Sequence, residues 1–160
     1  MRWLIAAVVS LLTFAFVGLA AVGGWLYWER VETRGEQAAR AVLPPLASKE
    51  IPEVFAYDYQ TVERSLGAAY LLLTPGYRHE FEKSANDKII PEARKREVVV
   101  QASVVGVGVM AAQRNSASVM VYMNRTVTDK SRQPLYDGSR LRVDYQRIDG
   151  KWLINFITPI

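Results

Sequence analysis

The sequence predicts an α+β protein in which an N-terminal transmembrane helix precedes one domain of short helices packed on a curved antiparallel sheet of about four strands. Three observations carry this prediction. The chain opens with a long uncharged stretch, continues with apolar residues at helical spacing, and ends with runs of β-branched residues that alternate with polar ones. Because helices precede strands along the chain, we expect them to form separate layers.

The uncharged stretch, residues 3–28, has the length and the flanking residues of a membrane anchor. As an α-helix it would be about 39 Å long, enough to cross a hydrocarbon core of about 30 Å with some tilt. Tryptophan and tyrosine side chains lie at both ends, where amphipathic rings favour the headgroup level. We therefore expect residues 1–30 to be an uncleaved transmembrane anchor.

A cleaved signal peptide is the alternative, because small residues at 18–21 follow an apolar run. The stretch continues past that point into an aromatic cluster, which favours the anchor. One arginine precedes the span and three follow it closely, a count that leans against export of the domain. Charge alone therefore leaves the topology open.

Two helical segments are expected next. Residues 31–47 have helix-forming composition and read as a juxtamembrane helix and linker, because Pro44 and Pro45 should break the helix. The domain proper is expected over residues 48–160, with Ser48 capping a short helix. A second helix ends before Pro75, and one face of it carries residues at i, i+4, i+7, i+8 and i+11, namely Val62, Leu66, Ala69, Tyr70 and Leu73.

The polar segment 77–97 is expected to hold a short helix and irregular chain, since Pro91 interrupts a continuous helix. Strands follow over 97–112 and 116–128, separated by a compact turn at 113–115. Two glycines in the first of them, Gly106 and Gly108, indicate a bulge or bend where the sheet curls.

The last two strands are expected to form a hairpin. Leu141, Val143 and Tyr145 alternate with polar residues, so one face of that strand is buried. Asp149-Gly150 is a two-residue hairpin signal, because glycine adopts positive φ without strain. In the final strand we expect Trp152, Ile154 and Phe156 to share one face.

This order of elements, with Asp-Gly-Lys-Trp in the final hairpin, resembles the nuclear transport factor 2-like (cystatin-like) superfamily, in which a curved sheet closes a cone-shaped domain. The whole arrangement is similar to the mycobacterial and actinobacterial Mce-associated membrane proteins. The likeness is carried by the anchor and by the segments YDYQTVE (57–63), LLLTPGYRHEF (71–81), IIPEAR (89–94), ASVVGVGV (102–109), VYMNRTVT (121–128) and SRLRVDYQRIDGKWLI (139–154).

The resemblance implies an accessory subunit that stabilises a Mce lipid or sterol importer. Its partners would be the permease and the substrate-binding Mce proteins, and the domain would lie outside the inner membrane on a single-pass anchor with its N-terminus inside. VirB8-type scaffold subunits of type IV secretion share the plan of one span and this fold, and they are the main alternative. Lipid-binding or isomerase-like members of the same fold are a further alternative.

The residues expected inside the cone do not form a catalytic group. A general acid or base needs converging polar partners. The strand faces expected to line the cone are instead apolar, with Val98, Val100, Val104, Met110, Val119, Val121 and Met123. Asp58 lies between two tyrosines and is interpreted as the N-cap of a helix that begins at Tyr59, with a cost of about 1 kcal/mol on removal. We expect no enzyme and no cofactor, and a lipid in the cone is a second binding hypothesis.

The composition argues against a metal site and against nucleic-acid binding. The chain has no cysteine and one histidine, His79, which lacks a second histidine at i+4, so no metal site is expected. Its 20 basic residues are interspersed with 16 acidic ones, so no nucleic-acid partner is expected. Tyrosine and arginine are favoured in binding hot spots, which makes the interface candidates Tyr57, Tyr59, Tyr122, Arg125 and Tyr136. Structural roles are expected for Asp58, Asp149, Gly150 and Trp152.

Overall fold

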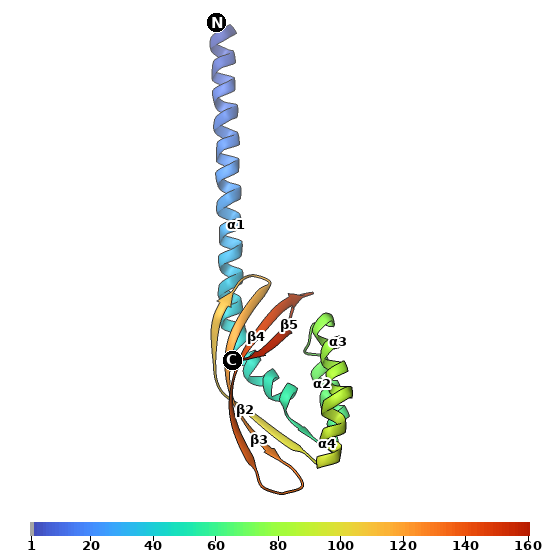
Figure 1. Ribbon diagram of the computed structural model, residues 1–160. Helices are drawn as coiled ribbons and strands as arrows, with labels where there is room; N and C mark the ends of the chain where they lie inside the picture. The colour runs from blue at the N-terminus through green and yellow to red at the C-terminus, as the bar shows by residue number, and fades with distance from the viewer. Residues whose placement is uncertain (1) are drawn as a thin grey trace.

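The computed structural model describes residues 2–160, although within the first helix the side chains at 2, 4–15, 21, 26 and 29 are not described. A long helix leads into a domain of short helices and a five-stranded meander in the order β1-β2-β3-β4-β5, each strand antiparallel to the next (Figure 1). The elements are α1 (Arg2–Phe55), β1 (Tyr57–Asp58), α2 (Val62–Tyr70), α3 (Pro75–Ser84), the π-helical turn η1 (Ala85–Ile89), α4 (Ile90–Arg96), β2 (Val99–Ala112), β3 (Ser116–Thr128), β4 (Leu135–Ile148) and β5 (Lys151–Pro159).

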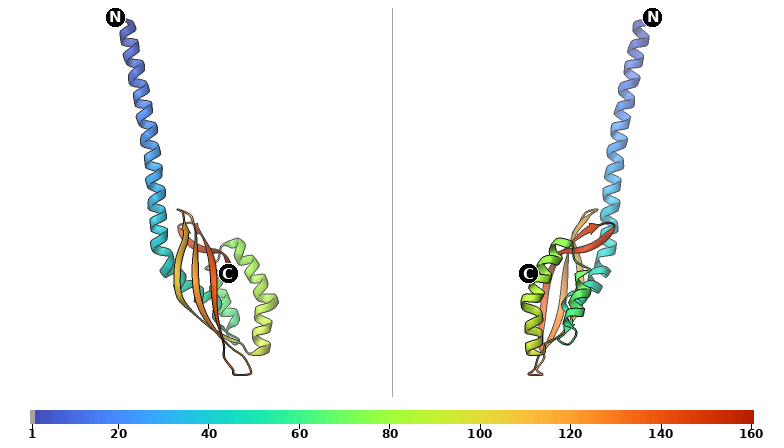
Figure 2. Two further views of the ribbon diagram at one scale, coloured as in Figure 1. Left: turned by 60° about the vertical axis from the view of Figure 1, so that its left-hand side comes forward. Right: turned by 90° about the vertical axis from the view of Figure 1, so that its right-hand side faces the viewer.

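Helix α1 continues through Pro44, Pro45 and Pro52, which corrects the expected break and linker. Five apolar residues of its last five turns are buried against the sheet: Ala39, Leu43, Ala47, Ile51 and Val54. A proline inside a helix costs about 3 kcal/mol, and burial of Leu43, Ile51 and Val54 contributes about 1.5–3 kcal/mol each, so the two effects are of the same order and the burial of this face offsets the cost of the prolines. Packing therefore keeps the segment helical where local propensity would end it, and the helix bends as it passes over the sheet (Figure 2).

In the part of the chain whose side chains the structure describes, no helix is long and apolar enough to cross a membrane. The expected anchor, residues 1–30, lies largely outside that part.

The fifth strand, β1, was not expected. It pairs Tyr57 with Val100 and Asp58 with Val99, and the next residue continues the pairing because the Tyr59 N–H donates to the Val98 carbonyl at 3.0 Å. Helix α2 consequently begins at Val62, three residues later than expected. Its buried face is confirmed, with Val62, Leu66 and Ala69 all inaccessible to solvent.

The segment from Pro75 to Arg96 is helical throughout, which corrects the expected irregular chain. Pro91 lies in the first turn of α4, directly after η1, where the Ile90 N–H donates to the Ala85 carbonyl five residues back. Proline clashes with the carbonyl four residues earlier in a regular α-helix, and a π-helical turn widens the backbone at such a point. The continuous helix lies beside α2 (Figure 1).

The sheet curls at the two irregularities of β2. Its register against β3 shifts between Val104 and Gly106, as the glycines predicted, and again between Val109 and Ala111. The second shift carries Met110 to the solvent, so the expectation that it lines the interior was wrong. The other expected interior residues are buried or half-buried.

The β4–β5 hairpin turns at Asp149 and Gly150, whose φ angles of 49° and 80° are both positive, as a two-residue turn of this kind requires. A bulge at Asn155 changes the alternation along β5. Ile154 is buried and Trp152 half-buried, but Phe156 lies exposed and Ile157 takes the inward position. The expected common face for Phe156 is therefore corrected.

Candidate functional site

Helix α1 and the β2–β3 turn meet in unusually close contact at Gly35. A Cβ atom at this position would lie 2.9 Å from Cγ and 3.1 Å from Cα of Arg114. The tip of the hairpin is itself held in place by backbone hydrogen bonds, from Gln113 to Ser116 and from Arg147 to Asn115, both at 2.8 Å. This joint, the contact of Gly35 with the β2–β3 turn, therefore holds the sheet close to α1.

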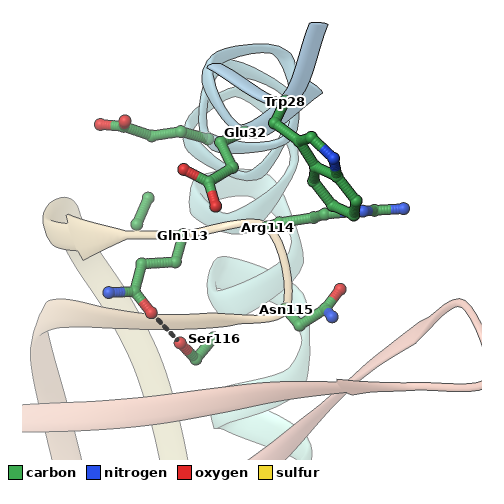
Figure 3. Close-up of a pocket in the computed structure, with 8 residues that line it drawn as sticks. Trp28, Glu32, Gln113, Arg114, Asn115 and Ser116 are labelled. Atoms are coloured by element: carbon green, nitrogen blue, oxygen red, sulfur yellow. Dashed lines mark hydrogen bonds between the residues drawn. The ribbon is translucent and has the colours of Figure 1, made fainter. Parts of the chain in front are cut away.

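A pocket of about 490 Å³ lies at this joint (Figure 3). Trp28, Glu32 and Glu36 line it from successive turns of α1, and four consecutive residues of the β2–β3 turn, 113–116, line it from the other side. Within the turn, the Ser116 hydroxyl donates to Oε1 of Gln113 at 2.8 Å, as Figure 3 shows. Residues with carboxylate, amide and guanidinium side chains therefore line one cavity.

A buried acid lies farther along α1. Glu50 is only 7% exposed, and the Tyr145 hydroxyl donates to its Oε2 at 3.2 Å. Burial raises the pKa of Glu50 from 4.5 to about 7, an effect that the Tyr145 hydrogen bond opposes in part. Burial and the neighbouring carboxylate also raise the pKa of Tyr145. The pair joins α1 to the middle of the sheet.

An apolar groove of about 340 Å³ lies beside this acid. Its walls are aliphatic and aromatic side chains of α1, of the loop after α2 and of β5, with Glu50 in the wall and Lys151 at β5. The loop is anchored to β5 because Leu73 forms a parallel bridge with Ile154. The groove is shallow and open to solvent, and it lies on the surface between α1 and β5 rather than inside the sheet.

The second polar group on the inner face lies around Arg125. Its Nη2 donates to Oδ2 of Asp137 at 2.8 Å, and the Ser139 hydroxyl donates to the same oxygen at 3.0 Å. Tyr57 on β1 is half-buried, and burial raises its pKa while the charge of Arg125 opposes the shift. Arg125 is thus committed to an ion pair within the domain.

The five interface candidates do not converge on one surface. Tyr57 and Arg125 belong to the inner face, and Tyr59 packs against the small core between α2 and the start of β2. Tyr122 and Tyr136 are 48% and 76% exposed, and their alternation with the buried residues places them on the outer face of the sheet.

The Asp58 carboxylate accepts the Gln60 N–H at 2.8 Å and so closes a turn after β1. The N-cap of α2 is Thr61, without a side-chain cap bond, which corrects the expected capping role of Asp58. The other residues expected to have structural roles do have them: Asp149 and Gly150 form the hairpin turn, and Trp152 packs against the main core.

Sequence reasoning missed Gly35 and Glu50. An isolated glycine within a helical pattern is a signal of close packing, and Gly35 carried that signal. Glu50 would have been placed inside the core had the helical spacing from Leu43 through Ala47 to Val54 been continued across the prolines.

No protein-family model matches the chain. The outer membrane protein Rv1973 of Mycobacterium tuberculosis is 26% identical over 160 residues, which is the full length of both chains. The uncharacterized protein Rv1362c of the same species is 26% identical over 140 residues, covering 86% of this chain and 64% of the relative. The chain therefore has relatives among mycobacterial proteins, one of them a membrane protein.

Solved structures share the fold. An IcmL-like type IV secretion system protein from Legionella pneumophila matches with a TM-score of 0.65 and 13% identity, over 76% of this chain and 93% of that one. The VirB8 protein of Agrobacterium tumefaciens matches with a TM-score of 0.55 and 11% identity, over 69% and 84%. The periplasmic domain of DotI matches with a TM-score of 0.58 and 14% identity, over 71% and 89%.

At these identities the structural likeness shows the fold alone, an α+β domain with a curled antiparallel sheet like that of VirB8. Neither the relatives nor the structures named above carry a Mce designation.

Proposed function

We propose that this chain is a non-enzymatic, membrane-anchored accessory subunit whose extracytoplasmic domain binds other proteins of the cell envelope. The observation that carries the proposal is the continuity of α1. This helix runs from Arg2 through the uncharged segment and into the domain, where Leu43 and Ile51 are fully buried. A domain joined to its anchor by a packed helix keeps a defined orientation at the membrane, as a scaffold requires.

The first candidate assembly is a VirB8-type secretion scaffold. Its support is the fold, because the solved neighbours include several type IV secretion proteins. The second candidate is a Mce-type importer, in which the chain would stabilise the permease and the substrate-binding Mce proteins. Its support is the segment-by-segment resemblance, together with mycobacterial relatives that cover the full chain.

The proposed location is the inner membrane, with a single span over residues 1–30 and the domain on the periplasmic side. One structural neighbour is a periplasmic domain, and a full-length relative is named an outer membrane protein. Both names support a domain outside the cytoplasm. The distribution of arginines around the uncharged segment did not support that location.

The surface proposed for partners is the outer face of the sheet around Tyr122. Val105, 68% exposed, lines a shallow depression of about 350 Å³ there, together with Tyr122 and Arg140. Exposed aromatic and arginine side chains around an apolar contact are typical of binding hot spots.

Affinity purification of the tagged full-length protein from its native membrane, followed by mass spectrometry, tests the proposal. Recovery of secretion-channel subunits supports the first assembly, and recovery of Mce proteins with their permease supports the second. A Tyr122→Asp variant expressed at the same level is the matched control and should recover fewer partners. A tagged protein that purifies from its native membrane without any partner would contradict the accessory role.

A further inference from the structure

We propose that the pocket between α1 and the β2–β3 turn binds the zwitterionic headgroup of an aminophospholipid in the adjoining membrane leaflet. This inference rests on the proposed anchor, and it assigns a ligand to a site other than the partner surface. Position, chemistry and rigidity of the pocket support it.

The pocket begins where the uncharged segment ends. Trp28 is the last residue of that segment, and Glu32 and Glu36 follow at intervals of one helical turn. At 1.5 Å per residue, the three side chains span about 12 Å of helix from the end of the apolar stretch. Tryptophan favours the headgroup level of a bilayer. An anchored α1 therefore places the pocket at headgroup depth.

The lining groups match both charges of such a headgroup. A primary ammonium fits beside the Glu32 carboxylate and the Trp28 ring, because carboxylates pair with ammonium groups and indole faces attract cations. A phosphate fits at the guanidinium of Arg114 and the side-chain amide of Asn115, which extend to the same side of the turn in Figure 3. Figure 3 shows Trp28 and Glu32 on α1 and the donors on the turn.

Two charged residues of the pocket, Glu32 and Arg114, are available to bind a headgroup. Among the residues whose side chains are described, neither Glu32 nor Arg114 takes part in an ion pair, whereas Glu36 is paired with Arg40 at 2.9 Å. The carboxylates would repel a purely anionic headgroup, since like charges at short range are unfavourable. The mixed lining therefore favours a lipid that carries an amine over one that carries only a phosphate.

The pocket is also rigid. Gly35 lets the Arg114 backbone approach α1 closely, and the hydrogen bonds of residues 113–116 hold the turn in shape. A site held by packing on both walls loses little conformational freedom when it binds a ligand.

Native mass spectrometry of the full-length protein in mild detergent tests the inference. The protein is titrated with short-chain phosphatidylethanolamine and, separately, with short-chain phosphatidylglycerol. We expect one retained phosphatidylethanolamine and a preference over phosphatidylglycerol of about fivefold or more. Glu32→Gln should abolish the preference, and Arg114→Gln should weaken binding of both lipids. Glu53→Gln and Arg64→Gln, exposed residues elsewhere on the domain, are the controls.

Equal retention of both lipids, or a preference that Glu32→Gln leaves unchanged, would overturn the inference. Glycerophosphoethanolamine, which lacks acyl chains, serves as a competitor. If it displaces the lipid at equal concentration, a soluble phosphoamine is the ligand and the assignment to a membrane lipid is wrong. Partner recovery by affinity purification is measured on the native protein, in parallel with its lipid preference. Recovered partners with no lipid preference in the native protein would contradict this inference alone, while a lipid preference with no recovered partners would contradict only the accessory role.

Discussion

The hydroxyl of Tyr145 on β4 donates a 3.2 Å hydrogen bond to the carboxylate of Glu50 on α1, across 95 residues of chain. Glu50 lies on the same helix that carries the uncharged segment, so this bond is one of the links between α1 and the sheet. The Glu50 carboxyl group is buried and has a pKa of about 7. The relationship makes the stability of the domain sensitive to pH near neutrality.

Stability should fall as the pH rises from about 4.5 to about 7. In this range the folded protein keeps the Glu50 proton that the unfolded chain has lost, because the folded pKa is about 7 and the ordinary value is 4.5. The loss is on the order of 3 kcal/mol in the free energy of unfolding and is complete above pH 7. Denaturant titrations of the full-length protein in detergent at pH 5, 6, 7 and 8 measure it.

Glu50→Gln should remove that slope, since an amide keeps the acceptor for Tyr145 without a titrating proton. Glu53→Gln, exposed on the same helix, should retain most of it, because burial contributes more to the raised pKa of Glu50 than the Glu53 charge does. A slope unchanged in Glu50→Gln would mean that another group causes the pH dependence.

Gly35→Ala should destabilise the protein, although alanine normally favours a helix by about 1 kcal/mol over glycine. The new methyl group would lie within 3.1 Å of three Arg114 atoms, one of them in the backbone, and overpacking of this kind costs about 1–3 kcal/mol. The matched control is Gly67→Ala in α2, where a Cβ would meet nothing within 4 Å. Melting temperatures should move in opposite directions for the two variants.

Asp58→Ala should lower the free energy of unfolding by about 1 kcal/mol, because it removes the acceptor of the Gln60 N–H. Asp58→Asn keeps an oxygen at the same place and should lie close to the native protein. An Asn variant as unstable as the Ala variant would show that the charge of Asp58, and not its hydrogen bond, matters.

The exposed Tyr122 on β3 and the half-buried Tyr57 on β1 should respond differently to replacement by alanine. Tyr122→Ala removes a side chain from the outer face and should change stability by less than about 0.5 kcal/mol while lowering partner recovery. Tyr57→Ala removes a ring that packs against the core between α2 and β2, and it should cost about 3 kcal/mol. Normal partner recovery with Tyr122→Ala would exclude this part of the outer face as the interface.

Local patterns in the sequence predicted much of the fold because they depend on neighbouring residues. The face of α2, the β2–β3 hairpin, the alternation of β4 and the turn at Asp149-Gly150 all follow from periodicity or from the φ angle that glycine permits. The α+β class and the curled sheet, shared with the VirB8-type domains, followed from the order of these patterns.

The errors have a common cause. Pro44, Pro91 and Asp58 were interpreted by their local preferences, as helix breakers and as a helix cap. In the folded chain, burial of one face of α1 outweighs its prolines, a π-helical turn accommodates Pro91, and β1 takes Asp58 into a strand and turn. Met110 and Phe156 were misplaced because strict alternation was assumed along their strands. A bulge adds one residue to a strand and so reverses the direction of the side chains that follow it.

By itself, the sequence determined the features that short-range physics decides: an uncharged segment long enough to span a bilayer, the helical and strand periodicities, and the hairpin turns. The tertiary structure alone decided which distant residues meet. It brought Glu50 to Tyr145, Gly35 to Arg114, and Trp28 to the β2–β3 turn. Such contacts depend on how the helix crosses the sheet, and that crossing is set by the summed burial of many side chains rather than by the preference of any one.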